Sequence, residues 1–126
     1  MPPAGDGQFV RLLSTQRLCR GGSELVVRVA GNVDVTTVPT LAEGFDRARH
    51  QVRAVDDGLG IVADLRAVGF LGVAGLWALV RAREACLGDG LDLRVVAEHA
   101  AVVSPLTLTG LDRVLNLRSG TGMGPG

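Results

Sequence analysis

The sequence predicts an α/β fold in which a mixed sheet of four to five strands packs against three to four helices. Apolar runs typical of buried strands alternate with segments whose apolar residues recur every three or four positions, as they do in helices. This alternation spans a chain of 126 residues, which is the size of one domain. Strands separated by helices pair in parallel through right-handed crossovers, so two successive β-α-β units are expected.

The first two strands are expected at Phe9 to Leu18 and at Glu24 to Gly31. The second segment, ELVVRVAG, is rich in β-branched residues and alternates in character, which favours a strand. The turn sequence GGS lies between the two segments. The sequence therefore predicts an antiparallel hairpin at the start of the domain.

A first helix is expected after the polar loop NVDVTTVPT. Thr40 and Glu43 fit a capping box at its start, and Pro39 fits its first turn. Gly44 costs this helix about 1 kcal/mol relative to Ala. Its apolar residues have helical spacing, and they are Val38, Leu41, Phe45, Ala48 and Val52.

The middle of the chain predicts a central strand and a second helix. Leu59 to Leu65 is apolar as far as Asp64, which is typical of a strand covered on both faces. The second helix is expected over Val73 to Leu87, with Gly88 ending it. Trp77 lies at the border of its apolar stripe and either closes the core or anchors a partner. The residues expected to face the core are Leu76, Leu79, Val80 and Leu87.

The last third predicts a strand at Leu91 to Ala97 and one further helix ending at Gly110. Pro105 falls inside this helix, so a kink or a split is expected. A short edge strand is expected at Val114 to Leu117. The apolar residues that define the helix are Val102, Val103, Leu106 and Leu108.

The ends of the chain are rich in glycine. We expect a disordered N-terminus at residues 1–7, a folded domain at 8–118 and a flexible tail at 119–126. The N-terminus has neither the basic start nor the long apolar segment of a signal peptide, and no apolar run is long enough to span a membrane. A cytoplasmic location without membrane contact is therefore expected.

Composition argues against nucleic-acid binding. The 13 basic residues, all arginines, balance 13 acidic residues, so the formal net charge is zero. Such a chain has no overall basic field to attract phosphates. Only four residues are aromatic (three Phe and one Trp), too few for a base-stacking platform.

Catalytic and metal-binding patterns are weak. His50 and His99 lack partners at ligand spacing, so no metal site and no cofactor are expected. Cys19 and Cys86 are isolated and have neither zinc nor C-x-x-C spacing, which favours two reduced thiols over a regulatory disulfide. An enzyme with a degenerate site has no support beyond the fold class.

The turn GFLGVAGLW, from Gly69 to Trp77, lacks a polar residue where one is expected. The first N–H groups of a helix need acceptors, which Ser, Thr, Asp or Asn usually supply. Here Gly72, Val73, Ala74 and Gly75 occupy the junction. Two carboxylates lie near strand ends elsewhere: Asp34, expected to fix a turn by accepting backbone N–H bonds, and Asp64, expected at the end of the central strand.

Four segments in this order resemble the STAS domain of bacterial anti-sigma factor antagonists. They are GNVDVTTVPTLAEGFDRA, GIVADLRAVGFLGVAGLWALVRA, GLDLRVVA and LTGLDRVLNL, and the resemblance as a whole runs from about Glu24 to Leu117. The order and spacing of the four segments carry the resemblance more than any one motif does. It implies a single STAS-like domain with the mixed sheet predicted above.

The resemblance also implies a function. In that family the turn before the second helix reads Asp-Ser-[Ser/Thr]-Gly-Leu, and its third residue is the phosphoacceptor. The unmodified antagonist binds an anti-sigma factor that is also a histidine-kinase-like serine kinase, and phosphorylation blocks the binding. Here the pattern reads Gly72-Val73-Ala74-Gly75-Leu76, so Ala74, which has no hydroxyl, stands at the phosphoacceptor position.

We therefore expect an antagonist that is not an enzyme and that cannot be phosphorylated at the usual position. A ligand-sensing or scaffold STAS domain in a regulatory assembly is the alternative. Control by redox state through Cys19 or Cys86, by another modification or by expression is left open, as is a weak homodimer. The residues expected to bind the partner are Asp34, Thr36, Thr37, Gly72, Val73, Ala74, Gly75 and Trp77.

Overall fold

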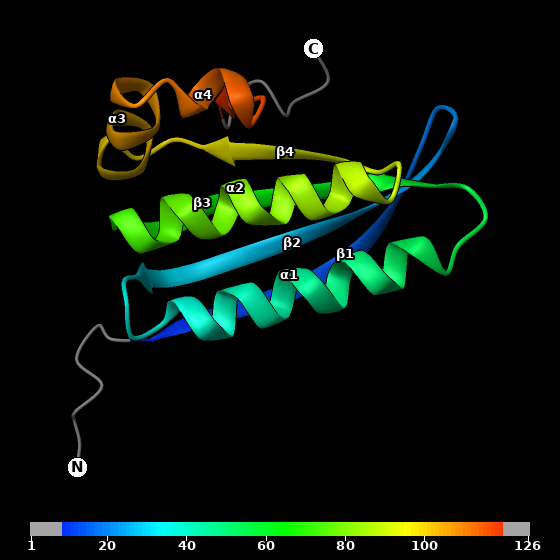
Figure 1. Cartoon of the computed structure of the whole chain (residues 1–126), viewed down its shortest axis with the longest axis horizontal. Helices are drawn as coiled ribbons and strands as arrows, with labels where there is room; N and C mark the ends of the chain where they lie inside the picture. Colours follow the sequence, from blue (N-terminus) through cyan, green and yellow to red (C-terminus); the bar gives the residue numbers. More distant parts are fainter. Residues whose placement is uncertain (1–8, 120–126) are drawn as a thin grey trace.

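Residues 9–119 are described by the computed structural model, which has the predicted α/β architecture (Figure 1). The elements follow the order β1 (Val10–Cys19), β2 (Gly22–Val33), α1 (Val38–Arg53), β3 (Gly58–Leu71), α2 (Val73–Gly88), β4 (Asp92–Ala97), α3 (Ala100–Leu108), α4 (Leu111–Val114) and β5 (Arg118–Ser119). Residues 1–7 and most of the expected tail lie outside the described residues.

The five strands form one mixed sheet in the order β1-β2-β3-β4-β5. β1 pairs antiparallel with β2, which confirms the predicted hairpin, whereas β2, β3, β4 and β5 pair in parallel. The parallel ladder between β2 and β3 continues to Val33 and Leu71, so these strands end side by side. Any group placed just after either strand therefore lies at the same edge of the sheet.

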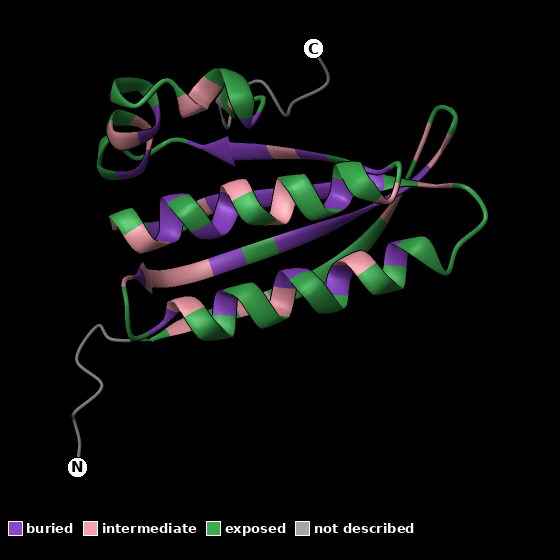
Figure 2. Ribbon diagram, in the orientation of Figure 1, coloured by how far each residue is buried: buried purple, intermediate pink, exposed green. Residues whose placement is uncertain are grey.

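α1, α2 and α3 cover one face of this sheet, and α4 packs on α3. α1 and α2 run side by side across the sheet (Figure 1), and α3 packs on β3 beyond them. Figure 2 shows buried positions recurring along α1 and α2. In α2, Leu76 and Leu79 are buried as predicted, whereas Val80 is only half-buried. The buried apolar residues of the helices all belong to one core cluster with alternate residues of β2, β3 and β4. Val26, Val62 and Val96 form a small separate cluster on the opposite face.

The start of α1 corrects the predicted capping box. The N-cap is Thr37, and Thr40 lies inside the first turn. Pro39 is in the first turn, as predicted, where its missing N–H costs nothing. The helix begins earlier than expected because the Asp34 loop supplies acceptors for the first N–H groups, as described below.

The central strand is longer than predicted. β3 does not end at Asp64 or Leu65 but continues to Leu71. Its second half pairs with the second half of β2, through a ladder with several register irregularities. Within α2, Leu87 is not a core residue, since it is 48% exposed, whereas Cys86 is 1% exposed and fills the core instead.

The C-terminal region is divided into two helices, but the break lies at Gly110 and not at Pro105, and the last strand is also elsewhere. α3 contains Pro105 and ends at Leu108, and Gly110 adopts a left-handed conformation with φ 77° before α4. Val114 belongs to α4, so the edge strand predicted at Val114 to Leu117 is wrong, and β5 forms at Arg118–Ser119. The left-handed residue reverses the chain so that Leu111 packs on the core and Leu115 is buried.

Candidate functional site

The candidate site lies where β2 and β3 end and where α1 and α2 begin. The N–H of Gly72 donates to the carbonyl of Val33 at 2.8 Å, which ties the turn before α2 to the end of β2. The loop 34–37 and the turn at Gly72 are therefore neighbours, although 35 or more residues separate them in the sequence. In this topology the carboxyl ends of parallel strands are the usual place for a binding site.

The Asp34 carboxylate organises the loop before α1. Its Oδ1 accepts hydrogen bonds from the N–H groups of Thr36 at 2.9 Å and Thr37 at 3.1 Å, and from the Thr36 hydroxyl at 2.7 Å. These bonds, led by that from the Thr36 hydroxyl, hold the pKa of Asp34 below its ordinary value. Asp34 thus fixes the turn, which is the role predicted for it.

Thr37 closes the same loop from the inside. Its hydroxyl accepts from the N–H of Asp34 at 2.9 Å and donates to the carbonyl of Asn32 at 2.8 Å. The residue is buried, whereas Thr36 is exposed. Of the two threonines expected to contact a partner, Thr36 faces outward and Thr37 shapes the surface from below.

α2 begins without a side-chain cap. Gly72 is its N-cap in an extended conformation, and no side chain accepts a hydrogen bond from the first turn. Gly75 is buried because it faces β2: a Cβ at this position would lie 2.6 Å from side-chain atoms of both Leu71 and Val33. Because glycine has no Cβ, the helix can start close to the sheet.

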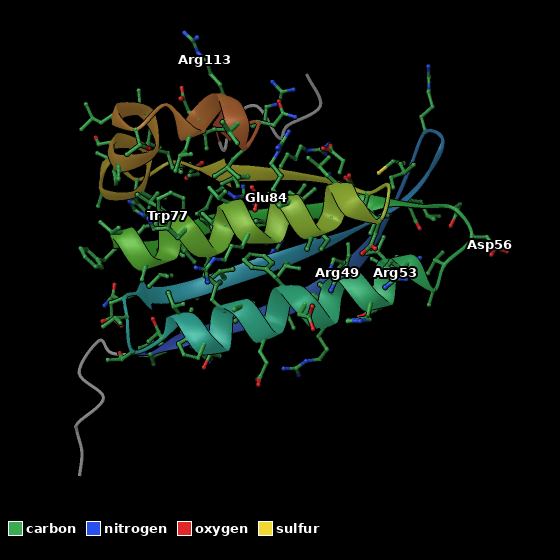
Figure 3. All side chains as sticks on the ribbon, in the orientation of Figure 1. Arg49, Arg53, Asp56, Trp77, Glu84 and Arg113 are labelled. Carbon is green, nitrogen blue, oxygen red and sulfur yellow. The ribbon has the colours of Figure 1, made fainter. Side chains whose placement is uncertain are left out.

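Apolar side chains gather on the outside of this site. Val73 is 69% exposed, and Trp77, one turn further along α2, is 60% exposed, so Trp77 does not close the core. Ala74, the residue after Val73, is half-buried, and Trp77 extends from the first half of α2 (Figure 3). Large exposed apolar side chains that lie together on a surface mark sites of protein association.

Two further members of the group were not predicted from the sequence. Val35 in the loop before α1 is 76% exposed, and Phe70 at the end of β3 is 50% exposed. A Cβ on Gly72 would lie 3.2 Å from the Phe70 ring, so that ring lies against the turn. We define the strand-end surface as these exposed side chains together with the half-buried alanine: Val35, Phe70, Val73, Ala74 and Trp77.

The thiols and histidines lie outside the strand-end surface. Cys86 is buried in the core, and burial raises the pKa of its thiol to about 11, which suppresses the reactive thiolate. Cys19 is half-buried at the end of β1, and both cysteines are free. His50 Nδ1 lies 2.8 Å from the Asp46 carbonyl oxygen, and His99 is the N-cap of α3.

Within residues 9–119, no three His, Cys, Asp or Glu side chains are close enough together to hold a metal ion. Over the same range, none of the helices is both long and apolar enough to cross a membrane.

Comparison with known proteins identifies the family. The STAS domain family matches residues 16–122, which is most of the chain. The chain belongs to the STAS domain family. The match takes in all of β2, α1, β3 and α2, so the strand-end surface is part of the STAS domain itself.

Relatives of this STAS domain include proteins named as anti-sigma factor antagonists. Over 94 residues it is 32% identical to the anti-sigma-F factor antagonist RsfB of Mycobacterium tuberculosis, in strains CDC 1551 and H37Rv, and the match covers 75% of this chain and 72% of the relative. A crystal structure of an anti-sigma factor antagonist from Mycobacterium paratuberculosis superposes with a TM-score of 0.68 at 32% identity, covering 85% of both chains.

Proposed function

We propose that this protein is an anti-sigma factor antagonist that binds its anti-sigma factor, a histidine-kinase-like serine kinase, through the strand-end surface. The observation that carries the proposal is the group of exposed apolar side chains around the start of α2. The two relatives named as antagonists support it. The protein acts by binding and not by catalysis.

Ala74 makes this association independent of phosphorylation at the usual position. If residue 74 is the family's phosphoacceptor position, a phosphate there adds a charge of about −1.5 to −2 to the docking surface in a relative that carries Ser or Thr. The methyl group of Ala74 cannot accept phosphate. Ala74 is half-buried next to the exposed Val73, so it presents an uncharged contact to the partner.

The remaining residues expected at the interface divide into two groups. Thr36, Val73, Ala74 and Trp77 contact the partner directly, and Val35 and Phe70 join them. The second group holds these side chains in place through the hydrogen bonds of the loop 34–37 and the close packing of the first turn of α2 on the sheet. It consists of Asp34, Thr37, Gly72 and Gly75.

Substitution of Ala74 tests the proposal. Ala74→Glu is expected to raise the Kd for the purified anti-sigma-F factor of M. tuberculosis at least about tenfold, or about 1.4 kcal/mol, because it buries a charge in the apolar contact. Trp77→Ala is expected to weaken binding to a similar extent. Isothermal titration calorimetry measures both changes.

A matched control is Ala101→Glu. Ala101 is exposed and is the second residue of α3, as Ala74 is the second residue of α2, so both variants place a carboxylate at the same helix position. The control is expected to bind like the unchanged protein. Absence of binding by the unchanged protein contradicts the proposed function. If Ala74→Glu binds with unchanged affinity, the partner binds another surface of the protein.

The phosphorylation part of the proposal has its own test. Ala74→Ser restores a hydroxyl, so the variant is expected to gain one phosphate from the kinase and ATP and then to leave the complex. The unchanged protein is expected to stay bound and to gain no phosphate at residue 74. Intact-mass spectrometry and gel filtration report the two outcomes, and failure of Ala74→Ser to gain phosphate contradicts the assignment of residue 74.

A further inference from the structure

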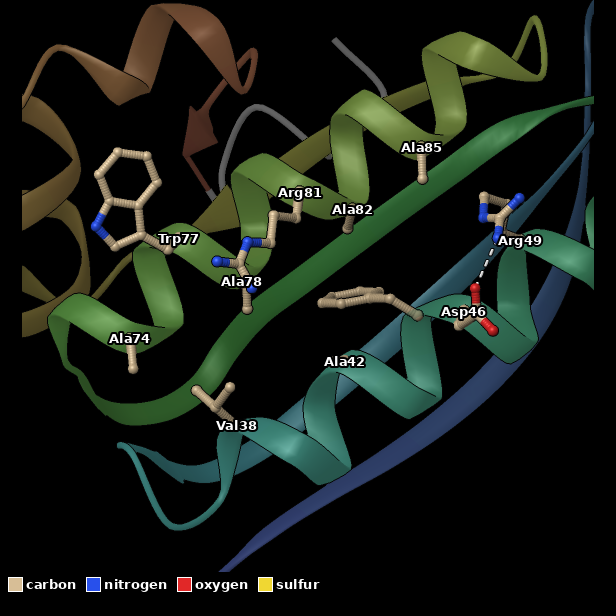
Figure 4. Close-up of a pocket in the computed structure, with 11 residues that line it drawn as sticks. Val38, Ala42, Asp46, Arg49, Ala74, Trp77, Ala78, Arg81, Ala82 and Ala85 are labelled. Carbon is tan, nitrogen blue, oxygen red and sulfur yellow. Dashed lines mark hydrogen bonds and ion pairs between the residues drawn. The ribbon is translucent and has the colours of Figure 1, made fainter.

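A groove of about 400 Å³ runs between α1 and α2. Phe45 lines the groove and is 2% exposed, so its ring forms the floor. Small side chains from both helices keep the groove open (Figure 4). Along α2 it extends from Ala74 to Ala85, which at 1.5 Å per residue is about 16 Å, or three helical turns. A segment of partner helix with apolar side chains on one face fits a groove of these dimensions.

The two arginines that line the groove differ in their partners. Arg49 on α1 is bonded to Asp46 at 2.6 Å and to the carboxylate of Asp89. Arg81 on α2 is exposed, and among the described residues it has no carboxylate within ion-pair distance. Figure 4 shows its guanidinium extending from α2 over the groove. The groove thus presents one uncompensated positive charge beside an apolar floor.

The groove is continuous with the strand-end surface. Ala74 and Trp77 belong to both, with Trp77 at the rim, and Val38 at the start of α1 lines the same end of the groove. A protein docked on the strand-end surface therefore has direct access to the groove. The positive charge of Arg81 favours a bound segment that carries an acidic side chain.

We propose that one helix of the anti-sigma factor lies along this groove, with apolar side chains on its floor and an Asp or Glu paired with Arg81. This inference rests on the proposed function. It adds that the contact with the partner continues from the strand-end surface into the groove, where a helix of the partner binds. Arg81 fixes the register of that helix, since a carboxylate in the wrong turn leaves the guanidinium unpaired in the interface.

Charge reversal at two neighbouring arginines tests the inference. Arg81→Glu is expected to raise the Kd for the anti-sigma-F factor of M. tuberculosis at least tenfold. Arg83→Glu is the matched control, because Arg83 is on the same helix and does not line the groove, and its Kd is expected to change less than twofold. Isothermal titration calorimetry at fixed ionic strength gives both values.

A second pair of variants tests occupation of the groove without changing its arginine. Ala42 is exposed and lines the groove, so Ala42→Trp fills it, whereas Glu43→Trp places the same side chain outside it. Only Ala42→Trp is expected to weaken binding tenfold or more. A photo-crosslinking amino acid at position 42 is expected to capture a helical segment of the anti-sigma factor that contains Asp or Glu.

The outcomes separate the two proposals. If Arg81→Glu and Ala42→Trp bind normally while Ala74→Glu weakens binding, the groove is empty and only this inference is overturned. If the unchanged protein does not bind at all, the proposed function itself fails. If the crosslink at position 42 joins two copies of this chain, or captures a loop of the anti-sigma factor, the helix assigned to the groove is wrong.

Discussion

At the scale of single residues, one buried hydroxyl determines the shape of the loop before α1. The Thr37 hydroxyl bridges the N–H of Asp34 and the carbonyl of Asn32, so it links the end of β2 to the start of α1. Asp34 holds the outer side of the same loop. Val35 is exposed between these two anchors, and it depends on both for its position.

Replacement of Thr37 tests this role. Thr37→Ala is expected to lower the free energy of unfolding by about 1–3 kcal/mol, because it leaves a buried N–H and a carbonyl without their partner. Thr37→Ser retains the hydroxyl and is expected to recover most of the loss. Thr40→Ala is the control, since Thr40 is exposed in the first turn of α1. Urea unfolding measures all three, and equal losses for Thr37→Ala and Thr40→Ala contradict the assigned role.

Part of the site could be predicted from single residues. Asp34 was predicted correctly as a turn residue, because Asp after a strand accepts backbone N–H bonds locally. Val35 and Phe70 were missed, although an apolar residue inside a polar loop and a phenylalanine directly after a glycine are visible in the sequence. Burial of Thr37 could not be predicted, since it depends on where β2 ends.

At the scale of elements, the seating of α2 on the sheet depends on Gly75. The helix begins immediately after β3, and its third residue faces Val33 of β2 and Leu71 of β3. A glycine normally costs a helix about 1 kcal/mol relative to Ala, so its presence here has a packing reason. Close approach at Gly75 sets the position of Val73 and Trp77 on the surface.

A pair of glycine substitutions within α2 tests this packing. Gly75→Val is expected to lower the free energy of unfolding by about 1–3 kcal/mol, because the added atoms overlap the side chains of Val33 and Leu71. Gly88→Val is expected to change it by less than about 0.5 kcal/mol, since a Cβ at Gly88 meets nothing within 4 Å. Thermal or urea unfolding distinguishes them, and equal effects mean that Gly75 does not set the helix position.

The order of the elements was predictable, but the length of β3 was not. Periodicity identified the strands and helices through β4, because each depends on local spacing of apolar residues. The segment from Arg66 to Leu71 is stabilised by pairing with the second half of β2, and that ladder contains register irregularities. A non-local interaction of this kind leaves little trace in a short window of sequence.

At the scale of the whole molecule, a formal net charge of zero does not reveal that two carboxylates, those of Glu24 and Asp64, are buried. Glu24 on β2 accepts a hydrogen bond from Arg17 of β1 at 3.0 Å and pairs with Arg94 at 3.1 Å. Asp64 on β3 accepts from Arg66 at 2.8 Å, with Arg28 at 3.8 Å. Both carboxylates are less than 10% exposed, at 7% and 4%. They alternate along their strands with core residues, so they lie on the sheet face opposite the core cluster.

The arginines decide the ionisation of both groups. Burial alone raises the pKa of each carboxyl. Hydrogen bonds, led by that from Arg17 to Glu24 and that from Arg66 to Asp64, outweigh it together with the arginine charges and, for Glu24, the Cys19 thiol, so the pKa of Glu24 lies below 4.5 and that of Asp64 below 3.8. A carboxylate with a lowered pKa in the folded state stabilises the fold above its ordinary pKa. That contribution is lost as the pH falls through the lowered value.

The free energy of unfolding is therefore expected to be steady from pH 7 to about pH 5 and to fall below the ordinary carboxyl pKa values of 4.5 and 3.8. Asp64→Asn is expected to reduce stability at pH 7 by about 1–3 kcal/mol and to make the acid decline shallower. Asp56→Asn is the control, because Asp56 is exposed and its removal leaves the profile unchanged. Urea unfolding at a series of pH values measures the slopes. Equal slopes in the unchanged protein and in Asp64→Asn would place the acid sensitivity of the fold in other carboxyl groups, and the strands would then not depend on this pairing across the sheet.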